Sequence, residues 1–449
     1  MTLALSGILL LSIGIYIQFA GYEQTLDFIL RATNKTHLRQ AVSESYFSLS
    51  KFSTLYIMSY IAAGMCSVLS YMANHYRYQV MDTIEELFAL LRKGISRLVT
   101  YVRELPGHEQ VVLSMIFISF VFVTIYNVLT KPLMVDEIGT WINVSRKGIL
   151  VSASYYYQPN NHLLHSIFTT IMYHLPFDPV VNLRLTVLFF SILTFFVLLD
   201  LFVKVFGRDS TVVNLSLLFC CFSYPFYMYS FQARGYMLLL FFYCVMTSLS
   251  LSLASNNPSK AHWLLFTLSS SLGFYSIPTF LYPYATTTVF LTMHLLSQRW
   301  YTRVSHLMLS IMMSTVLVLL LYLPVILFSG LDSLFANEWV KSIDRAIVVA
   351  NLIPYLNRWG DWIVGFAITP FHLIVGAIIL VSLVRSLRFG GELRLHYSYI
   401  AVSFICAPLF LILQGVLPPA RVFIYLLVPI VLFLGLQISW LRVRMGTVL

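Results

Sequence analysis

The sequence of 449 residues is too apolar for a soluble domain, because 59% of its residues are hydrophobic and only 10% are charged, whereas about a quarter of the residues of soluble domains are charged. Its formal net charge is +10, but Lys and Arg lie in short links between apolar runs, where orientation signals and lipid-headgroup contacts are expected rather than nucleic-acid binding. The chain is therefore predicted to use lipid as its solvent for most of its length.

Apolar runs of about 20 residues recur from end to end and predict helices that cross the membrane, because a helix satisfies its backbone hydrogen bonds internally. The expected fold class is an all-α, polytopic bundle of about 12 spans. In chain order the predicted spans cover residues 3–20, 52–73, 111–129, 180–203, 211–229, 236–254, 262–276, 279–296, 306–328, 362–384, 397–415 and 421–441.

Residues 74–110 differ from the runs around them. Between Met81 and Ile95, apolar residues recur at helical spacing with charged residues between them, which predicts an amphipathic helix on the cytoplasmic membrane surface. We therefore divide the chain into an N-terminal module with two spans, residues 1–108, and a transmembrane core, residues 109–449.

The charged links predict how the chain is oriented. If every apolar run crosses once, the links rich in Lys and Arg fall on one side, which the positive-inside rule makes cytoplasmic. Both termini then lie in the cytoplasm, in a multi-pass protein of the plasma or inner membrane. On the opposite side, residues 130–179 and 329–361 form links long enough to carry short juxtamembrane helices. We expect the active site in these links, on the outer face.

An adjacent pair of acids, Asp136-Glu137, follows the third predicted span directly. The other adjacent pair, Glu85-Glu86, lies on the amphipathic helix, where charged residues are ordinary. Because apolar residues flank Asp136-Glu137 near the outer membrane surface, we predict that Asp136 acts as a general base and that Glu137 positions the acceptor or the loop. The alternative is a solvated loop or a helix cap.

A second polar cluster lies in the same link, between Tyr155 and His165. Its tyrosine rings can stack on sugar faces and its amides can bond to hydroxyls, which predicts a substrate-lining role. His162 and His165 would share a helix face, as a metal pair would, but no third ligand is visible and we predict no metal site. The alternative is a polar helix start with Asn as N-cap. The predicted lining residues of this cluster and of neighbouring links are Trp141, Tyr157, Asn160, Asn161, His162, His165 and Tyr236.

Three arginines lie at the outer ends of apolar runs, where the positive-inside rule disfavours cations. They are Arg184, Arg234 and Arg421. A guanidinium can bind phosphate through two parallel hydrogen bonds, so we predict that these arginines bind the phosphate of a lipid-linked donor. Snorkelling to ordinary headgroups is the alternative for each of them.

The order of five motifs along the chain carries a resemblance. The motifs are Asp136-Glu137, Pro159-Asn-Asn-His-Leu-Leu-His165, Asn182-Leu-Arg184, Gln232-Ala-Arg-Gly-Tyr236 and Pro418-Pro-Ala-Arg421. By their order and membrane side, the core resembles the GT-C superfamily of membrane glycosyltransferases. It looks closest to the branch with protein O-mannosyltransferases, the lipid A aminoarabinose transferase and rhizobial lipopolysaccharide sugar transferases. The N-terminal module lies outside this resemblance.

The resemblance implies an inverting transfer of a sugar from a polyprenyl-phosphate donor to an acceptor hydroxyl on the outer face, with Asp136 as the catalytic base. The acceptor is a glycan, a lipid or a protein; the sequence names neither it nor the sugar. We expect no required cofactor, with a divalent metal left open. Membrane lipid is an expected partner, and nucleic acid is not.

Other functions are also compatible with about twelve spans. A transporter or flippase of lipid-linked or small-molecule substrate is the main alternative, but transporters place ionisable groups near the membrane midplane, whereas the charges here lie at segment ends. A structural membrane protein would leave the outward acids and arginines without a purpose. A polysaccharide polymerase or ligase of the outer face is the remaining alternative.

Overall fold

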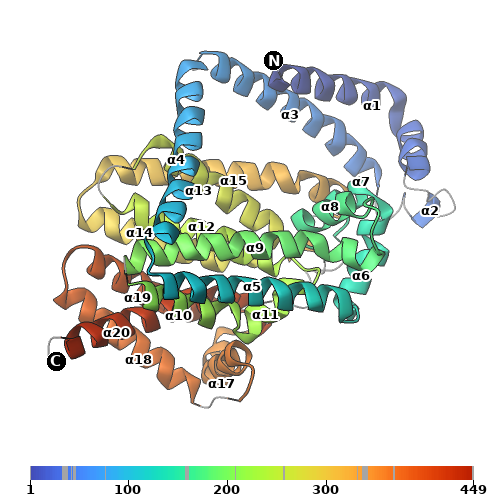
Figure 1. Ribbon diagram of the computed structural model, residues 1–449. Helices are drawn as coiled ribbons and strands as arrows, with labels where there is room; N and C mark the ends of the chain where they lie inside the picture. The colour runs from blue at the N-terminus through green and yellow to red at the C-terminus, as the bar shows by residue number, and fades with distance from the viewer. Residues whose placement is uncertain are drawn as a thin grey trace.

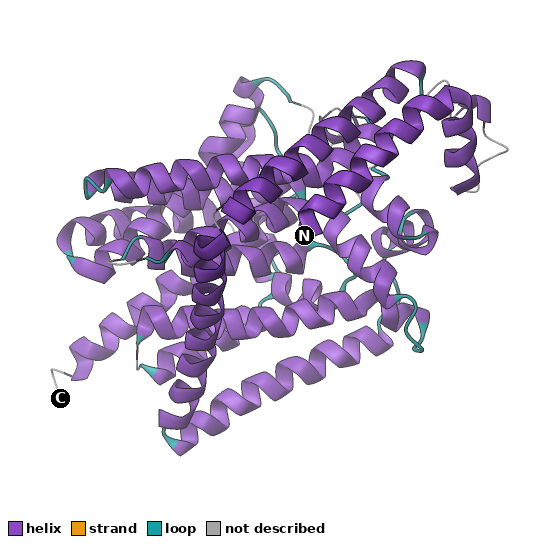
Figure 2. Ribbon diagram, turned by 90° about the horizontal axis from the view of Figure 1, so that it is seen from above, coloured by secondary structure: helices purple, strands orange, loops and turns teal. Residues whose placement is uncertain are grey.

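The computed structural model describes residues 2–32, 39–41, 43, 47–75, 77–156, 161–207, 209–255, 258–330, 332–335, 342–367 and 370–446. Throughout these residues the regular structure is helical, and no strand occurs among them (Figure 1, Figure 2). The predicted all-α class is therefore confirmed for the part of the chain that the structure describes.

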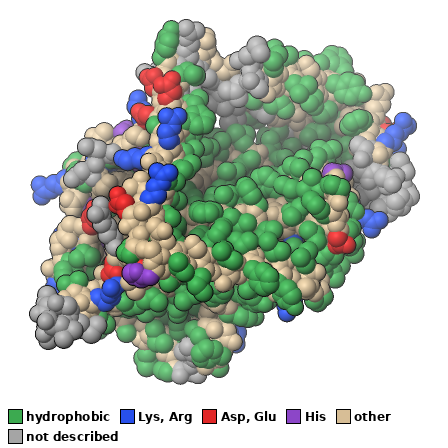
Figure 3. All heavy atoms as spheres, in the orientation of Figure 1, with side chains coloured by type: hydrophobic (Ala, Val, Ile, Leu, Met, Phe, Trp, Pro, Cys, Tyr) green, Lys and Arg blue, Asp and Glu red, His purple; other side chains and the backbone are tan. Residues whose placement is uncertain are grey.

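Most of the long helices run along one common direction, which is horizontal in Figure 1. Helices α9 (Pro179–Phe206) and α12 (Tyr236–Leu253) pack side by side, and α5 (Gly107–Thr130) packs against α9. α12 is the most enclosed of the candidate spans, since it also contacts α13 (Lys260–Ser276) and α14 (Leu281–Ser297). Hydrophobic side chains cover the middle of the face shown in Figure 3, and charged ones gather toward its edges. This surface suits a bundle that crosses a bilayer.

Eight of the described helices are long and apolar enough to cross a membrane, and a bent pair raises the number to nine. The pair consists of α10 (Ser210–Cys221) and α11 (Tyr224–Phe231), which meet at 61°. Pro225 lies in the first turn of α11, where its missing N–H costs no helical hydrogen bond, so a new helix can begin there. A multi-pass membrane protein is thus confirmed, but twelve spans are not.

The difference between twelve predicted spans and nine candidates comes from α3 (Leu49–His75), α13 and α14, which are helical but are not among the candidate spans. α13 and α14 have 17 residues each, which is the lower limit for crossing a hydrocarbon core about 30 Å thick. Helix α3 has 27 residues, but several of its side chains fall outside the described part of the chain. The remaining long helices are α15 (Tyr301–Phe328), α18 (Phe371–Arg388), α19 (Gly391–Gln414) and α20 (Leu427–Gly446). Two 3-10 helices precede long helices: η4 (Pro278–Phe280) lies before α14, and η5 (Ala420–Leu426) lies before α20.

The N-terminal helices α1 (Thr2–Ala32) and α3 form a hairpin that packs mainly on itself and lies beside the bundle (Figure 1). The short helix α2 (Arg39–Ala41) lies between them. Helix α4 (Arg77–Glu104) connects the hairpin to α5 and runs across the bundle helices rather than along them. Its Arg97 pairs with Asp200 of α9 at 2.8 Å, which fastens α4 to the core. The domain boundary and the cytoplasmic position of α4 stay predictions.

Both long links carry helices, which are short in the first link and include one of 20 residues in the second. The first forms α6 (Val135–Asn143), η3 (Ser145–Lys147), α7 (Ile149–Ser154) and α8 (Leu163–Met172), and the second forms α16 (Asp332–Phe335) and α17 (Arg345–Val364). The Ser329 hydroxyl joins the two links, since it donates to the Ser154 carbonyl at 2.7 Å and accepts from the Tyr156 amide at 2.8 Å. The Ile343 amide donates to the Gly415 carbonyl at 2.7 Å, which brings the link after α19 to the same end of the bundle.

Candidate active site

The acidic pair lies in the first turn of α6. This helix begins at Met134, whose backbone N–H donates to the Glu137 carboxylate at 2.8 Å. Such a bond satisfies a backbone donor that the helix itself leaves unpaired. Negative charge in the first turn also favours the helix through its dipole. The local sequence therefore explains why a helix begins here, but the two carboxylates have very different surroundings.

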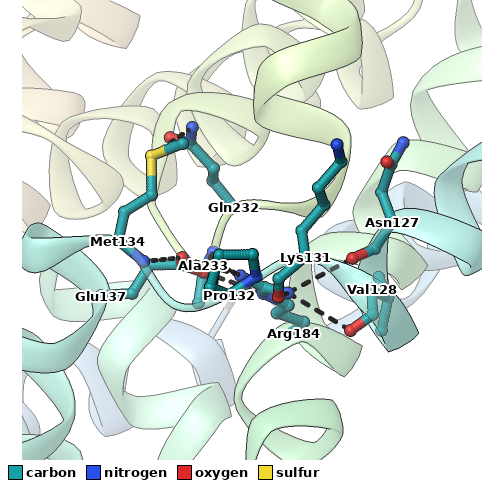
Figure 4. Close-up of polar contacts among 9 residues, drawn as sticks. All are labelled: Asn127, Val128, Lys131, Pro132, Met134, Glu137, Arg184, Gln232 and Ala233. Atoms are coloured by element: carbon teal, nitrogen blue, oxygen red, sulfur yellow. Dashed lines mark hydrogen bonds and ion pairs between the residues drawn. The ribbon is translucent and has the colours of Figure 1, made fainter.

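Glu137 forms a fully buried ion pair with Arg184 of α9 (Figure 4). Arg184 Nε and Nη2 donate to the two carboxylate oxygens at 3.0 and 2.9 Å, and both side chains are 0% exposed. The Ala233 amide donates to the same carboxylate at 2.7 Å. Glu137 thereby joins the start of α6 to α9 and to the link between α11 and α12.

Arg184 uses its remaining donors on backbone carbonyls at the end of α5 (Figure 4). Its Nη1 donates to the carbonyls of Lys131 at 2.8 Å, Val128 at 3.3 Å and Asn127 at 3.4 Å, and its Nη2 donates to that of Pro132 at 2.9 Å. A cation here satisfies carbonyls that the helix end leaves unpaired and complements the helix dipole. This arrangement favours a structural role for Arg184 over the predicted contact with donor phosphate.

The side chain of Asp136 is more exposed than that of Glu137 and forms fewer hydrogen bonds. Its side chain is 40% exposed, and its carboxylate Oδ2 lies 3.4 Å from Arg421 Nη1 and 4.0 Å from Arg234 Nη2. The first contact is a long hydrogen bond and the second is beyond hydrogen-bond distance. The structure thus brings three predicted site residues together around a carboxylate that other molecules can reach.

Hydrogen bonds hold the side chain of Arg234 in place next to the Asp136 carboxylate. Its side chain is 3% exposed, and its Nη1 donates to Thr140 Oγ1 at 3.0 Å and to the Asp136 carbonyl at 3.4 Å. Its Nη2 lies 3.3 Å from His162 Nε2. At the rim, Arg421 is 37% exposed and its guanidinium lies over the Tyr236 ring.

His162 and His165 are both buried at the start of α8. His162 accepts a hydrogen bond from the Gly235 amide at 2.7 Å and packs edge-on against Tyr236. Burial lowers the pKa of both rings and nearby Arg234 adds to the effect; the pKa of His162 falls well below 6.5 and that of His165 to about 3. Both histidines are therefore neutral near pH 7, and only His162 contacts the residues around Asp136.

Four other predicted lining residues have different outcomes. Asn161 is buried and bonds to the Tyr155 carbonyl at 2.6 Å and to the Ser166 hydroxyl at 2.7 Å, which favours a role in joining α7 to α8. Tyr157 and Asn160 lie outside the described residues. Trp141 is half-buried, and its indole Nε1 has no hydrogen-bond partner among the residues that the structure describes.

A cavity of about 310 Å³ lies next to the site, between α17 and the link that leads to Arg421. Its lining residues are Asn351, Pro354, Tyr355, Arg358, Leu417, Pro418, Pro419 and Ala420. The Tyr355 hydroxyl donates to the Pro418 carbonyl, which holds the turn before Arg421 against α17. The volume falls at the lower end of the range typical of ligand pockets.

No group of three His, Cys, Asp or Glu side chains is placed to hold a metal ion within the described ranges. The polar atom that contacts the ring nitrogens of His165 is Thr169 Oγ1, at 3.4–3.5 Å. The site's charged groups are one carboxylate and two guanidiniums. This set suits proton acceptance and anion binding.

Two residues of the site, Thr140 and Gly235, were not predicted from the sequence. Thr140 lies four residues after Asp136 on the same helix face, a spacing that could have revealed it. Gly235 allows a close approach, since a Cβ atom there would lie 2.9 Å from His162 Cβ. A single glycine between Arg234 and Tyr236 gives no such signal in the sequence.

These features define a class, an all-helical multi-pass membrane protein with an arginine-rich polar site at one end of its bundle. No protein-family model matches the sequence, and no curated protein matches it. Among solved structures, the chain is similar to the crystal structure of ArnT from Cupriavidus metallidurans in the apo state, at 15% identity and a TM-score of 0.40, over 73% of this chain and 76% of that chain. ArnT is a GT-C aminoarabinose transferase. So distant a likeness carries no argument about function, which rests on the geometry of the site.

Proposed function

We propose that the protein is an inverting glycosyltransferase that moves a sugar from a polyprenyl-phosphate donor to an acceptor hydroxyl on the outer face of the membrane. The observation that carries the proposal is the exposed carboxylate of Asp136 within 4.0 Å of Arg234 and Arg421. Such a site combines a proton acceptor with two fixed cations, which are the groups that displacement of a phosphate from a sugar requires.

Asp136 is the general base of the proposed reaction. The acceptor oxygen attacks the anomeric carbon, its proton passes to Asp136, and the bond from that carbon to the phosphate oxygen breaks. The electron pair of the broken bond leaves with the polyprenyl phosphate. Exposure and long contacts leave the Asp136 carboxylate available for this proton.

The two arginines stabilise the leaving phosphate. Its negative charge grows as the bond breaks, and cations already held in place stabilise that charge without reorganisation at the moment of reaction. Arg234 is held by Thr140 and by the Asp136 carbonyl. Arg421 reaches the same carboxylate from the start of η5, and its exposure makes it accessible to a lipid headgroup.

The membrane supplies the donor in this proposal. The site then lies on the outer face and both termini lie in the cytoplasm, an orientation that the positive-inside bias of the links supports. His162, Tyr236 and Trp141 would line the sugar or phosphate, and the acceptor class stays open among glycan, lipid and protein.

Donor consumption tests the proposal. Wild-type protein, Asp136→Asn and Asp178→Asn are reconstituted at equal amounts with radiolabelled polyprenyl-phosphate sugars and an extract that supplies acceptors. Asp178→Asn is a matched control, because Asp178 caps α9 at the same end of the bundle and Asn caps a helix equally well. We expect donor loss with the wild type and the control but not with Asp136→Asn. No loss with any wild-type preparation, across donors and acceptors, would favour transport instead.

A further inference from the structure

The cavity next to the site has one wall made by α17 and another made by the turn that leads to Arg421. Asn351 and Arg358 line it from positions two turns apart on one face of α17. The same face continues one turn further to Trp362, whose ring packs against Tyr229 of α11 with centroids 5.9 Å apart. The face of α17 that lines the cavity therefore also reaches the aromatic residues of the site.

The cavity is joined to the proposed base in two ways. Along the chain, Ala420 lines the cavity and the next residue, Arg421, reaches the Asp136 carboxylate at 3.4 Å. Across the rings, Tyr229 packs against Tyr236 with centroids 4.5 Å apart, and the Arg421 guanidinium lies over Tyr236. The cavity thus borders directly on the groups that the proposed reaction uses.

The walls of this cavity are held in place by their own contacts. The Tyr355 hydroxyl donates to the Pro418 carbonyl, and the rings of Pro418 and Pro419 fix the backbone there. Trp359 of α17 stacks on Phe423 of η5 with centroids 4.1 Å apart. A preformed pocket loses less conformational freedom when a ligand binds. Its volume of about 310 Å³ is small for a ligand pocket and suits a group about the size of one sugar unit.

The polar groups of the lining indicate what kind of group fits. Asn351 uses its amide nitrogen on the Ile347 carbonyl at 2.9 Å, so its amide oxygen is the atom that can accept from a hydroxyl. Among the described lining residues, Arg358 is the one that carries a charge. Its guanidinium can bind a phosphate or a carboxylate through two parallel hydrogen bonds. A hydroxyl and an anionic group on one small unit are the features of an acidic sugar.

We infer that this cavity binds the acceptor, and that the acceptor presents an acidic sugar unit, with its phosphate or carboxylate on Arg358 and a hydroxyl on Asn351. The inference rests on the proposed function and deepens it, because it names a class of acceptor. An inverting displacement needs separate places for the donor phosphate and the acceptor, which lie on opposite sides of the anomeric carbon. With the phosphate at Arg234 and Arg421, the cavity supplies the second place.

Acceptor pools of different charge test the inference. An extract of cell-envelope glycans and glycolipids is separated by anion exchange into a neutral and an acidic pool. Each pool is added with a radiolabelled polyprenyl-phosphate sugar to protein in phosphatidylcholine vesicles, whose headgroups carry no net charge. The wild type is compared with Arg358→Gln and Asn351→Asp. Arg345→Gln is the matched control, because Arg345 is an exposed arginine in the first turn of the same helix and is not among the described lining residues.

We expect the label to enter the acidic pool. Arg358→Gln should raise the KM for that pool about tenfold, the lower end of the usual effect of a lost hydrogen bond to a charged group, and leave the KM for the donor unchanged. Asn351→Asp should also raise the KM for the acidic pool, because it places a second negative charge beside that of the acceptor. Arg345→Gln should behave as the wild type. Butanol extraction then distinguishes a labelled glycolipid from a labelled glycan, either of which can carry the acidic sugar.

Several results would overturn the inference and leave the proposed function standing. They are label that enters mainly the neutral pool, an unchanged KM for the acidic pool in Arg358→Gln, and a KM that rises for the donor instead. An equal rise in Arg345→Gln would also overturn it, since the effect would then be one of general charge. If the Arg358→Gln effect appears only in vesicles with added phosphatidylglycerol, the anion is a lipid headgroup and the inference fails.

Two further outcomes complete the test. If Arg358→Gln does not fold, Asn351→Asp decides, because an unchanged KM for the acidic pool in that variant overturns the inference and a raised one supports it. If the wild type consumes no donor with either pool, the proposed function fails and the inference fails with it.

Discussion

The two neighbouring acids, Asp136 and Glu137, differ in almost every physical respect. Glu137 is fully buried, accepts four hydrogen bonds and is paired with an arginine whose remaining donors are also used. Asp136 is 40% exposed and has one hydrogen bond of 3.4 Å and one longer ionic contact. Successive positions of one helix turn thus place one carboxylate inside the protein and the other at its surface.

The difference shows that an ion pair whose hydrogen-bonding groups are all used and one with free hydrogen-bonding capacity suit different roles. A buried pair whose donors and acceptors are all used has no capacity left for a ligand, and removing one partner leaves an unpaired buried charge. A loose pair at the surface contributes little to stability and can exchange its contacts for those of a substrate. The proposed function therefore gives Glu137–Arg184 a structural role, and it gives the chemistry to Asp136 with Arg234 and Arg421.

The largest effect is expected at Asp136. Substitution Asp136→Asn should lower the transfer rate by about 10²–10⁴, the usual range for loss of a general base. Its unfolding temperature should fall much less than that of Glu137→Gln, because Asp136 is 40% exposed and the buried Arg234, 4.0 Å away, is still held by Thr140 and the Asp136 carbonyl. Single-turnover transfer and thermal unfolding on the same preparation measure both. A rate close to wild type would remove Asp136 from the chemistry.

The opposite pattern is expected at the buried pair. Glu137→Gln should destabilise the fold by about 3–5 kcal/mol, because it leaves the charge of Arg184 buried without its partner. The yield of folded protein and its unfolding temperature should both fall. Adding Arg184→Met to the same chain should restore part of the loss, since both charges are then gone. Two independent losses that simply add would contradict the coupling.

A smaller effect is expected at the rim arginine. Arg421→Gln should reduce transfer by about ten- to a hundredfold, the scale of one hydrogen bond to a charged group, with little change in stability. Steady-state kinetics against donor concentration measures it. Arg345→Gln, at an exposed arginine at the start of α17, is the matched control and should behave as wild type. Equal loss in both variants would indicate a general effect of charge.

The last effect is a dependence of stability on pH, which is absent near neutral pH and grows as the pH falls below 6.5. The pKa of His165 falls from 6.5 to about 3 on folding, so the unfolded chain binds a proton below pH 6.5 that the folded chain does not. This contribution to stability is complete above pH 6.5 and is lost as the pH falls toward 3, by at most about 1.4 kcal/mol per pH unit. Thermal unfolding across this range should show the loss, and His165→Gln should reduce it. The same reduction in His108→Gln, at an exposed histidine, would contradict the assignment.

Much of this site could be predicted from the sequence. Apolar runs located the helices, and the positions of Asp136, Arg234 and Arg421 relative to those runs singled out residues that the fold brings together. Such signals are local, because they depend on spacing and on the ends of spans. The number of spans was less predictable, since α13 and α14 are only 17 residues long and two short helices make a bent pair.

The division of labour between the two acids could not be predicted in the same way. Arg184 is 47 residues from Glu137, and Ala233 is 96 residues away. Which arginine pairs with which acid depends on how α9 and the link after α11 pack against α6. Because this packing is not visible in the sequence, Arg184 was predicted to bind phosphate together with Arg234 and Arg421. The hydrogen bonds of Asn161 to the Tyr155 carbonyl and the Ser166 hydroxyl depend in the same way on how α7 and α8 pack.

The most direct test measures turnover per folded molecule for Asp136→Asn and Glu137→Gln side by side. Folded protein is counted by gel filtration, and transfer of radiolabelled sugar is divided by that count. We predict that Asp136→Asn folds in normal yield and is nearly inactive, whereas Glu137→Gln folds in low yield and each folded molecule keeps most of its activity. Normal turnover in Asp136→Asn together with inactive, well-folded Glu137→Gln would contradict the account, because the chemistry would then belong to the buried acid.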